Sequence, residues 1–240
     1  STTVALELEP YGSRVLVFSQ RASAGQANRA AAAPPALDLS SGWSVTFGEN
    51  GKPVTMEKLR SWTDDEPTRF FSGLATYERE ISVPEDFLRE GLAVRLDFGE
   101  SRSGARTPGM GYQALLEAPV REAAVVYVNG RRAGAVWCPP YSVDVTGLLR
   151  RGSNSLRVVV GNLAVNHMAG GRLPDYRLLN LRYGVRFEAQ DMDKVQPAPA
   201  GLLGPIRLIV AAAGRPSLND SVRLEDAVHQ WGRSHPNRWR

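Results

Sequence analysis

The sequence lacks several of the features on which common protein functions depend. Its 240 residues include one cysteine, Cys138, so an internal disulfide and a metal site built from several cysteines are both excluded. No apolar run approaches the roughly 20 residues that a membrane-spanning helix needs, and the first ten residues lack the basic-then-apolar pattern of a signal peptide. A membrane is therefore not an expected partner, and the compartment is left open by these features.

Charge and motif content remove further classes of function. The net charge is only +4, from 29 basic and 25 acidic residues, and the basic excess gathers near the C-terminus, which is not the footprint of a nucleic-acid-binding protein. No glycine-rich phosphate loop precedes a helix, and no Gly-x-Ser-x-Gly nucleophile elbow occurs. Two of the three histidines lie in the basic tail, so neither a catalytic triad nor a zinc site is expected.

The chain divides into four parts by composition. Residues 1–20 contain two short β segments joined by a turn, and they are interpreted as the closing strands of a preceding β module, with the chain beginning inside a longer protein. Residues 21–37, rich in Ala, Ser, Gly and Asn, are predicted to be a linker. Residues 38–212 form the predicted β-sandwich domain, and residues 213–240 a basic tail with a short helix.

Short β segments separated by Gly, Pro and Asn dominate the predicted domain and indicate an all-β sandwich. The predicted strands are 43–47, 70–83, 92–98, 123–128, 133–137, 156–162 and 206–210. Asn129 and Gly130 tolerate positive φ, so residues 125–137 are predicted to be a β-hairpin. A short helical insertion is predicted over 175–183, where Tyr176, Leu179 and Tyr183 share one face and Gly184 ends the helix.

Carboxylates are considered first as chemical groups, because glycoside hydrolysis uses two of them across a pocket. No pair is selected by its spacing: Glu78 and Glu80 fall on one face of a predicted strand, where solvent exposure is the ordinary explanation. A hydrolytic chain that brings Glu78 and Glu188 together by folding stays a further hypothesis. Glu188, Asp191 and Asp193 are weak candidate calcium ligands, since their oxygens suit a hard cation but no regular calcium loop is present. No other cofactor is expected.

Aromatic and amide side chains remain as candidates for carbohydrate binding, because sugar rings stack on flat side chains while their hydroxyls bond to Asn, Asp and Tyr. The alternatives are that Trp43, Tyr127 and Trp137 are core residues and that the Asn and Asp side chains stabilise turns. The candidate carbohydrate-binding residues are Trp62, Trp137, Tyr141, Asn162, Asn166, Asp175 and Tyr176.

An ordered set of motifs runs from Trp43, Trp62 and Phe70–Arg79 through Val128–Gly130, Trp137–Thr146, Gly152–Leu156 and Val160–Asn162. This set resembles the sugar-binding jelly-roll modules of glycoside hydrolases and is similar to the galactose-binding-like domain of family 2 enzymes. The later motifs, Leu173–Tyr176, Tyr183–Phe187 and Gly201–Pro205, resemble the C-terminal region of the α-L-rhamnosidases of glycoside hydrolase family 106. The likeness covers residues 7–210. It departs from the family at Ala200, where a serine is expected, and at 104–111, an apparent insertion.

The resemblance implies a jelly-roll, galactose-binding-domain-like sandwich that belongs to a secreted or periplasmic bacterial enzyme. In that family the catalytic acids lie in an upstream barrel domain, so no residue of this chain inherits a catalytic role. The expected function is a non-catalytic C-terminal module that supports the catalytic domain of the same polypeptide and contacts a rhamnoside-containing glycan. The alternative is a free-standing lectin-like carbohydrate-binding module.

Overall fold

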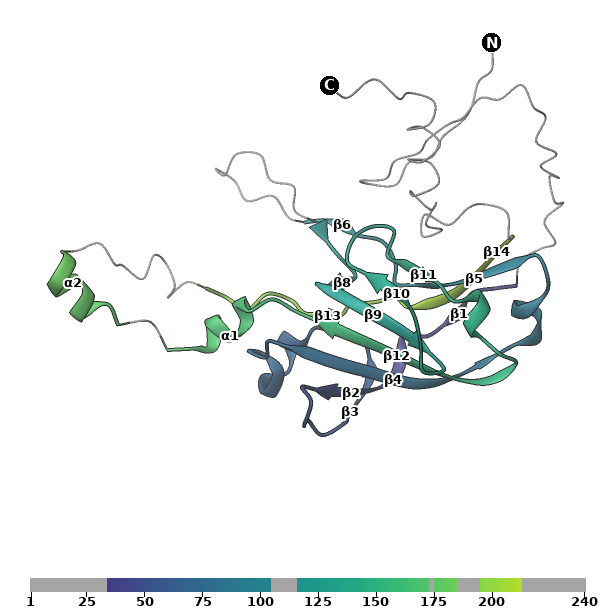
Figure 1. Ribbon diagram of the computed structural model, residues 1–240, viewed down its shortest axis with the longest axis horizontal. Coiled ribbons are helices and arrows are strands. Elements are labelled where there is room, and N and C mark those ends of the chain that lie inside the picture. Colours follow the sequence, from purple (N-terminus) through teal and green to yellow (C-terminus); the bar gives the residue numbers. More distant parts are fainter. Residues whose placement is uncertain (1–33, 105–115, 173–174, 185–194, 213–240) are drawn as a thin grey trace, which may run out of the picture.

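Two antiparallel sheets of the computed structural model pack face to face and enclose the hydrophobic core (Figure 1). The structure describes residues 34–104, 116–172, 175–184 and 195–212. The smaller sheet has the order β1 (Leu37–Asp38), β14 (Arg207–Ala212), β5 (Leu92–Asp97), β11 (Ser142–Asp144). The larger has the order β10 (Arg131–Val136), β9 (Ala123–Val128), β12 (Gly152–Gly161), β4 (Leu74–Val83), β2 (Ser41–Phe47), β3 (Val54–Lys58). The predicted all-β sandwich is confirmed.

Short elements connect and close the two sheets. Two small ribbons, β8 (Val120–Arg121) with β13 (Gly201–Leu202) and β6 (Arg102–Ser103) with β7 (Leu116–Glu117), lie beside them. The 3₁₀ turns are η1 (Trp62–Asp64), η2 (Glu66–Thr68), η3 (Glu85–Leu88) and η4 (Thr146–Leu148). The two helices of the described residues, α1 (Val165–Gly170) and α2 (Arg177–Tyr183), both fall between β12 and β13.

The central strands β4 and β12 are built by alternation of apolar and polar side chains. They pair over ten positions, from Leu74 opposite Gly161 to Val83 opposite Gly152. Because successive side chains of a strand point to opposite faces, one face of each strand is buried in the core while the other carries serine, glutamate and arginine. Leu156, Val158 and Val160 are each at most 2% exposed, as expected for a sandwich core.

The predicted hairpin joins β9 to β10 at Asn129 and Gly130. Their φ angles are 51° and 77°, the positive values that a tight primed turn requires, so this prediction is confirmed. Nearby, the fully buried Asn154 ties the turn before β12 together. Its amide nitrogen donates to the carbonyls of Arg150 and Gly152, and its amide oxygen accepts from Arg150 N and Asn129 Nδ2.

The segment between β12 and β13 leaves the sandwich and carries both helices, and residues 163–172 and 175–184 are called the arm. α2 matches the predicted helix, and Gly184 follows it with a φ of 77°. α1 was not expected from the sequence. α2 lies away from the two sheets at the far end of the arm (Figure 1). None of the helices in the described residues is long and apolar enough to span a membrane.

The predicted boundaries of the four parts remain predictions. The sandwich strands run from Leu37 to Ala212, so they begin one residue before the predicted domain of 38–212 and end at its last residue. The predicted closing strands of residues 1–20, most of the linker at 21–37, and the tail at 213–240 lie outside the described residues.

Candidate functional site

Trp62 is a core residue and does not lie on a carbohydrate-binding loop, contrary to the expectation from the sequence. Its side chain has 0% exposure, and its rings meet those of Phe47 and Phe71 edge to face at 5.4 and 5.7 Å. The indole Nε1–H donates to the hydroxyl of Tyr77 at 2.5 Å. Because both faces of the indole are packed, Trp62 has no surface to offer a sugar ring.

Gly201 explains why Trp62 and Tyr77 can pack so closely beneath β13. A Cβ atom at this position would lie 2.4 Å from Trp62 Nε1 and 2.7 Å from the Tyr77 hydroxyl. The φ of Gly201 is +102°, a conformation that residues with side chains rarely adopt. The motif beginning at Gly201 is therefore a packing requirement of the fold.

Asn162 and Asn166 are structural residues that fix the base of the arm. Asn162 accepts a hydrogen bond from Gly73 N and donates one to Phe71 O, at 2.9 and 2.8 Å. Asn166, only 1% exposed, donates to Ala198 O and accepts from Ala198 N, both at 2.9 Å. Both side-chain amides are therefore bonded to backbone partners. The alternative interpretation, that these residues stabilise turns and loops, describes them best.

Asp175 and Tyr176 lie farther along the arm, beside α2. The Asp175 carboxylate accepts two parallel hydrogen bonds from the guanidinium of Arg177, one at Oδ1 at 2.9 Å and one at Oδ2 at 2.6 Å. These bonds hold the pKa of Asp175 below its usual range. Both side chains of the pair are exposed to solvent, and the structure does not bring Asp175 and Tyr176 into one pocket with the other predicted residues.

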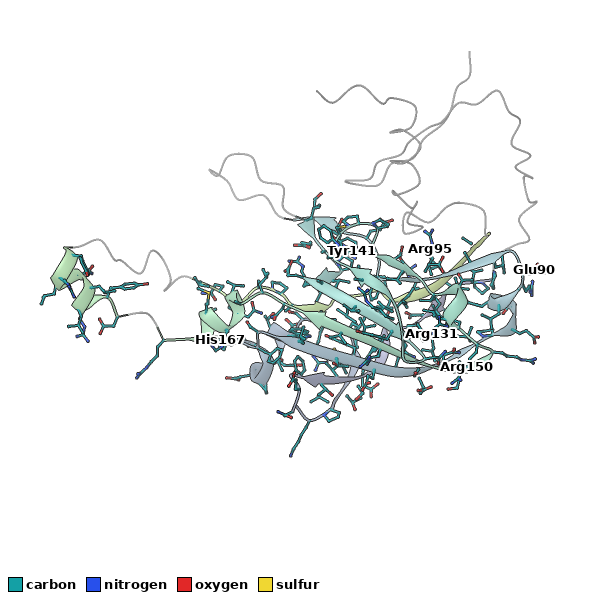
Figure 2. The ribbon with its side chains drawn as sticks, in the orientation of Figure 1. Glu90, Arg95, Arg131, Tyr141, Arg150 and His167 are labelled. Carbon is teal, nitrogen blue, oxygen red and sulfur yellow. The ribbon has the colours of Figure 1, made fainter. Side chains whose placement is uncertain are left out.

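Trp137 and Tyr141 flank the loop between β10 and β11. Trp137 is 72% exposed, so the alternative that it is a core residue is wrong for this position, whereas Trp43 is fully buried. Tyr141 is nearly buried, and its carbonyl accepts a hydrogen bond from Phe98 N at 2.9 Å. Figure 2 shows Tyr141 well away from His167, which marks the base of the arm. The predicted residues are thus spread over the core, the arm and this loop.

A pocket of about 770 Å³ lies at the C-terminal end of β5 and is called the Asp97 pocket. Its residues Asp97 and Gly99 flank Phe98, whose backbone N–H donates to Tyr141 O. Its charged lining consists of Asp97, Glu100, Arg102, Glu117 and Arg207, and its apolar lining of Ala118, Pro119, Leu203, Pro205 and Ile209. Gly99, Ser101 and Gly204 complete it. The volume is within the range of small-molecule sites, and the mixture of charged and apolar lining residues suits a ligand that has hydroxyls on an apolar ring.

Asp97 is a carboxylate of this pocket whose pKa is shifted from its ordinary value. Burial raises its pKa, and Glu100 adds to the rise, while the backbone N–H of Gly99 and the cation of Arg207 act in the opposite direction. The strand register places Asp97 opposite Arg207 on β14 and opposite Ser142 on β11. The site therefore holds a partly desolvated acceptor with an arginine on the neighbouring strand.

Sequence reasoning missed the Asp97 pocket because its residues come from three separate segments. The one signal was glycine: Gly99 has a φ of +89°, and a Cβ there would lie 2.9 Å from Cδ of Pro205. This close approach brings the loop after β5 against the loop before β14. The two loops are about a hundred residues apart in the sequence, and no local pattern predicts their contact.

A second hollow, of about 520 Å³, lies on the outer face of the larger sheet. Glu78 and Glu80, considered above as candidate acids, both line it. Glu80 accepts a hydrogen bond from the hydroxyl of Ser153 at 2.8 Å, and the guanidinium of Arg157 covers the ring of Tyr127 at 4.2 Å. With the ring face occupied by an arginine, the hollow lacks an open aromatic platform for a sugar.

The candidate metal ligands and the second candidate acid cannot be placed. Glu188, Asp191 and Asp193 lie outside the described residues, so the weak calcium expectation stays a prediction. The same holds for the hypothesis that pairs Glu78 with Glu188. Within the described ranges no group of three or more His, Cys, Asp or Glu side chains could hold a metal ion, and Cys138 is a free, partly exposed thiol.

Comparison with known proteins finds glycoside hydrolases. No family model matches the chain. A curated protein from Formosa agariphila, named "Putative beta-glucuronidase", is 27% identical over 202 residues, which are 74% of this chain and 16% of that protein. Among solved structures, a rhamnosidase from Novosphingobium sp. PP1Y is similar in fold, with a TM-score of 0.54 and 24% identity. That match covers 84% of this chain and 16% of the rhamnosidase.

More distant similarity extends to other glycosidase structures. A β-glucuronidase from an uncultured Clostridium sp. has a TM-score of 0.47 and 20% identity, covering 76% of this chain and 30% of that one. The chain thus spans about one-sixth of the length of the curated relative and of the rhamnosidase. The resemblance is to one β domain of much longer glycoside hydrolases.

Proposed function

We propose that this chain is a non-catalytic β-sandwich module, C-terminal in position, of an α-L-rhamnosidase-like glycoside hydrolase. The module supports the catalytic domain of the same polypeptide and contacts carbohydrate through the Asp97 pocket. One observation carries the proposal: a sequence comparison and a fold comparison each match most of this chain to 16% of a glycoside hydrolase. The catalytic acids belong, on this account, to the part of the enzyme that this chain does not match.

The choice of an α-L-rhamnoside rests on the motif resemblance, not on the geometry of a site. Several motif residues have structural tasks: Asn129 and Gly130 make the hairpin, Asn154 ties a turn, and Gly201 allows Trp62 to pack. These tasks would be the same in a module attached to an enzyme of different specificity. A β-glucuronide is therefore the second substrate to test, because the curated relative is named for that activity.

The chemistry of the Asp97 pocket supports contact with a neutral or weakly charged sugar. The carboxylates of Asp97 and Glu117 can accept hydrogen bonds from sugar hydroxyls, and the guanidinium groups of Arg102 and Arg207 can donate to them. Pro119 and Pro205 are among the apolar lining residues and offer C–H surface to a pyranose ring. The module acts by positioning: a rigid sandwich holds these loops at the edge of a substrate cleft.

Titration calorimetry with L-rhamnose and methyl α-L-rhamnoside on the isolated chain tests the carbohydrate contact. We expect saturable binding that Asp97→Asn weakens about tenfold, because one charge-assisted hydrogen bond becomes a neutral one. Glu80→Gln is the matched control, since Glu80 lies in the other hollow, and its binding is expected to equal that of the wild type. Absence of heat up to high millimolar sugar, or equal binding by the Asp97 variant, would reject this pocket as a sugar site.

The alternative function is a free-standing lectin-like carbohydrate-binding module. It is favoured by one observation, that all residues of the Asp97 pocket come from this chain. Both functions predict sugar binding by the isolated chain. A glycosidase assay on the complete polypeptide that contains this chain distinguishes the two functions. The enzyme-module proposal requires activity in that assay, whereas the lectin alternative predicts none.

A further inference from the structure

Exposed apolar side chains concentrate at one end of the molecule. Of the ten large apolar residues that are exposed within the described ranges, eight lie on the arm or where the arm leaves the sandwich. At the base these are Phe70, Leu74, Leu163 and Met168, each at least 43% exposed. Exposed apolar side chains that gather in one region, and are not scattered singly over the surface, mark an interaction surface.

Helix α2 at the far end of the arm is apolar on two sides. Leu178 and Leu181 share one side and are 84% and 89% exposed, while Leu179 and Tyr183 share another side and are 41% and 48% exposed. A seven-residue helix is too short to be stable in water by itself, and helices gain most of their stability from packing an apolar face. α2 lies away from both sheets (Figure 1), so its packing partner is not the sandwich.

The base of the arm, in contrast, is firmly attached to the sandwich. The hydroxyl of Ser72 donates to Leu163 O and accepts from His167 N, both at 2.9 Å. Asn162 and Asn166 add the four backbone hydrogen bonds described above. Gly170 contacts Phe70 so closely that a Cβ there would lie 2.5 Å from Cγ of the ring. A fixed base with an apolar tip is the arrangement of a docking element.

We infer that the arm docks into an apolar cleft on the catalytic domain of the same polypeptide. This inference rests on the proposed function and specifies the surface through which the module supports its enzyme. The matched relatives carry more than four-fifths of their length outside the region similar to this chain. On the proposed function, the catalytic domain is likewise covalently linked to the arm and would be present at high effective concentration. A second copy of this chain would have to compete with that linked partner.

The charges on α2 refine the chemistry expected of the cleft. Arg177 is already neutralised by Asp175. Arg182 lies over the ring of its neighbour Tyr183, 5.3 Å from the centroid, and its guanidinium has donors left for an acidic group. The cleft is therefore expected to receive the leucine side chains of α2 and to place a carboxylate near Arg182.

Hydrogen exchange measured on α2 tests the inference. The amides of residues 177–183 are compared in this chain alone and in the complete polypeptide that contains the catalytic domain. We expect fast exchange in the isolated chain and exchange at least about 100-fold slower in the complete polypeptide, because docking suppresses local opening. The double variant Leu178→Asp/Leu181→Asp is expected to lose this protection in the complete polypeptide. Both side chains are highly exposed, so the sandwich itself should fold normally.

Val54→Asp provides the matched control, since Val54 is a 52% exposed apolar residue on β3, away from the arm. It should leave α2 protected. Slow exchange in the isolated chain, together with a dimer by light scattering that the double variant dissociates, would overturn the inference in favour of a second copy.

Unprotected α2 in a complete polypeptide that still hydrolyses glycosides would refute the docking inference and leave the proposed function standing. A complete polypeptide with neither a catalytic domain nor glycosidase activity would instead refute the proposed function itself.

Discussion

Replacing Tyr77 with phenylalanine tests whether Trp62 has a structural role. The Tyr77 hydroxyl accepts hydrogen bonds from Trp62 Nε1 at 2.5 Å and from Leu202 N at 3.4 Å, in a region with no solvent exposure. The substitution keeps the rings in contact but leaves the indole N–H without a partner. A buried unsatisfied donor costs about 1–3 kcal/mol, and the second, longer bond adds less. We expect the free energy of unfolding to fall by about 2–3 kcal/mol.

Urea denaturation followed by far-ultraviolet circular dichroism measures this change. Tyr127→Phe is the matched control, because Tyr127 lies on the outer face of the larger sheet beneath Arg157 and should change stability by less than about 0.5 kcal/mol. A Tyr77→Phe variant as stable as the wild type would mean that the indole N–H is not held by Tyr77. In that case the position of Trp62 would depend on its ring contacts with Phe47 and Phe71 and not on this hydrogen bond.

Three further substitutions test other parts of the fold. Gly201→Ala should lower the free energy of unfolding by about 3 kcal/mol or prevent folding, because its Cβ would overlap Trp62. The control Gly91→Ala, also at positive φ but in open space, should cost only about 1 kcal/mol in the same urea assay. Asn154→Ala should cost about 3 kcal/mol or more in urea midpoints, since it strands the backbone groups of Arg150 and Gly152; a loss below about 1 kcal/mol would contradict the network. Burial raises the pKa of Asp97, so the folded state holds this proton more tightly than the unfolded chain does, and the associated stability is lost as the pH rises from the ordinary carboxyl value through the raised one. Asp97→Asn should therefore flatten the fall in stability that begins as the pH rises above the ordinary carboxyl range, and an unchanged pH profile would contradict the burial of Asp97.

The strands and the main turn were predictable from the sequence because their signals are local. Alternation along β4, β9 and β12 fixes which side chains face the core, and the Asn129–Gly130 step specifies its own turn. The helix α2 was predicted from its apolar spacing and from Gly184. The same spacing does not indicate what packs against the helix, because we infer that its partner is the catalytic domain and not part of this chain.

The candidate site was poorly predictable because its geometry depends on contacts that are distant in sequence. Trp62 lies in a segment between strands, and tryptophan is a residue type on which sugar rings stack. Its contacts with Tyr77 and Gly201 nevertheless bury it in the core. Asn162 looks like a pocket residue, but the approach of Phe71 and Gly73 commits its amide to the backbone. Each residue type was compatible with two roles, and only tertiary packing distinguishes them.

Hydrolysis of aryl glycosides tests the central claim most directly. The complete polypeptide and this 240-residue chain are assayed side by side on an aryl α-L-rhamnoside and an aryl β-glucuronide. The account predicts turnover of the rhamnoside by the complete polypeptide and only background release by the isolated chain. Enzymatic turnover by the isolated chain, or none by a complete polypeptide that carries the remaining domains, would contradict it.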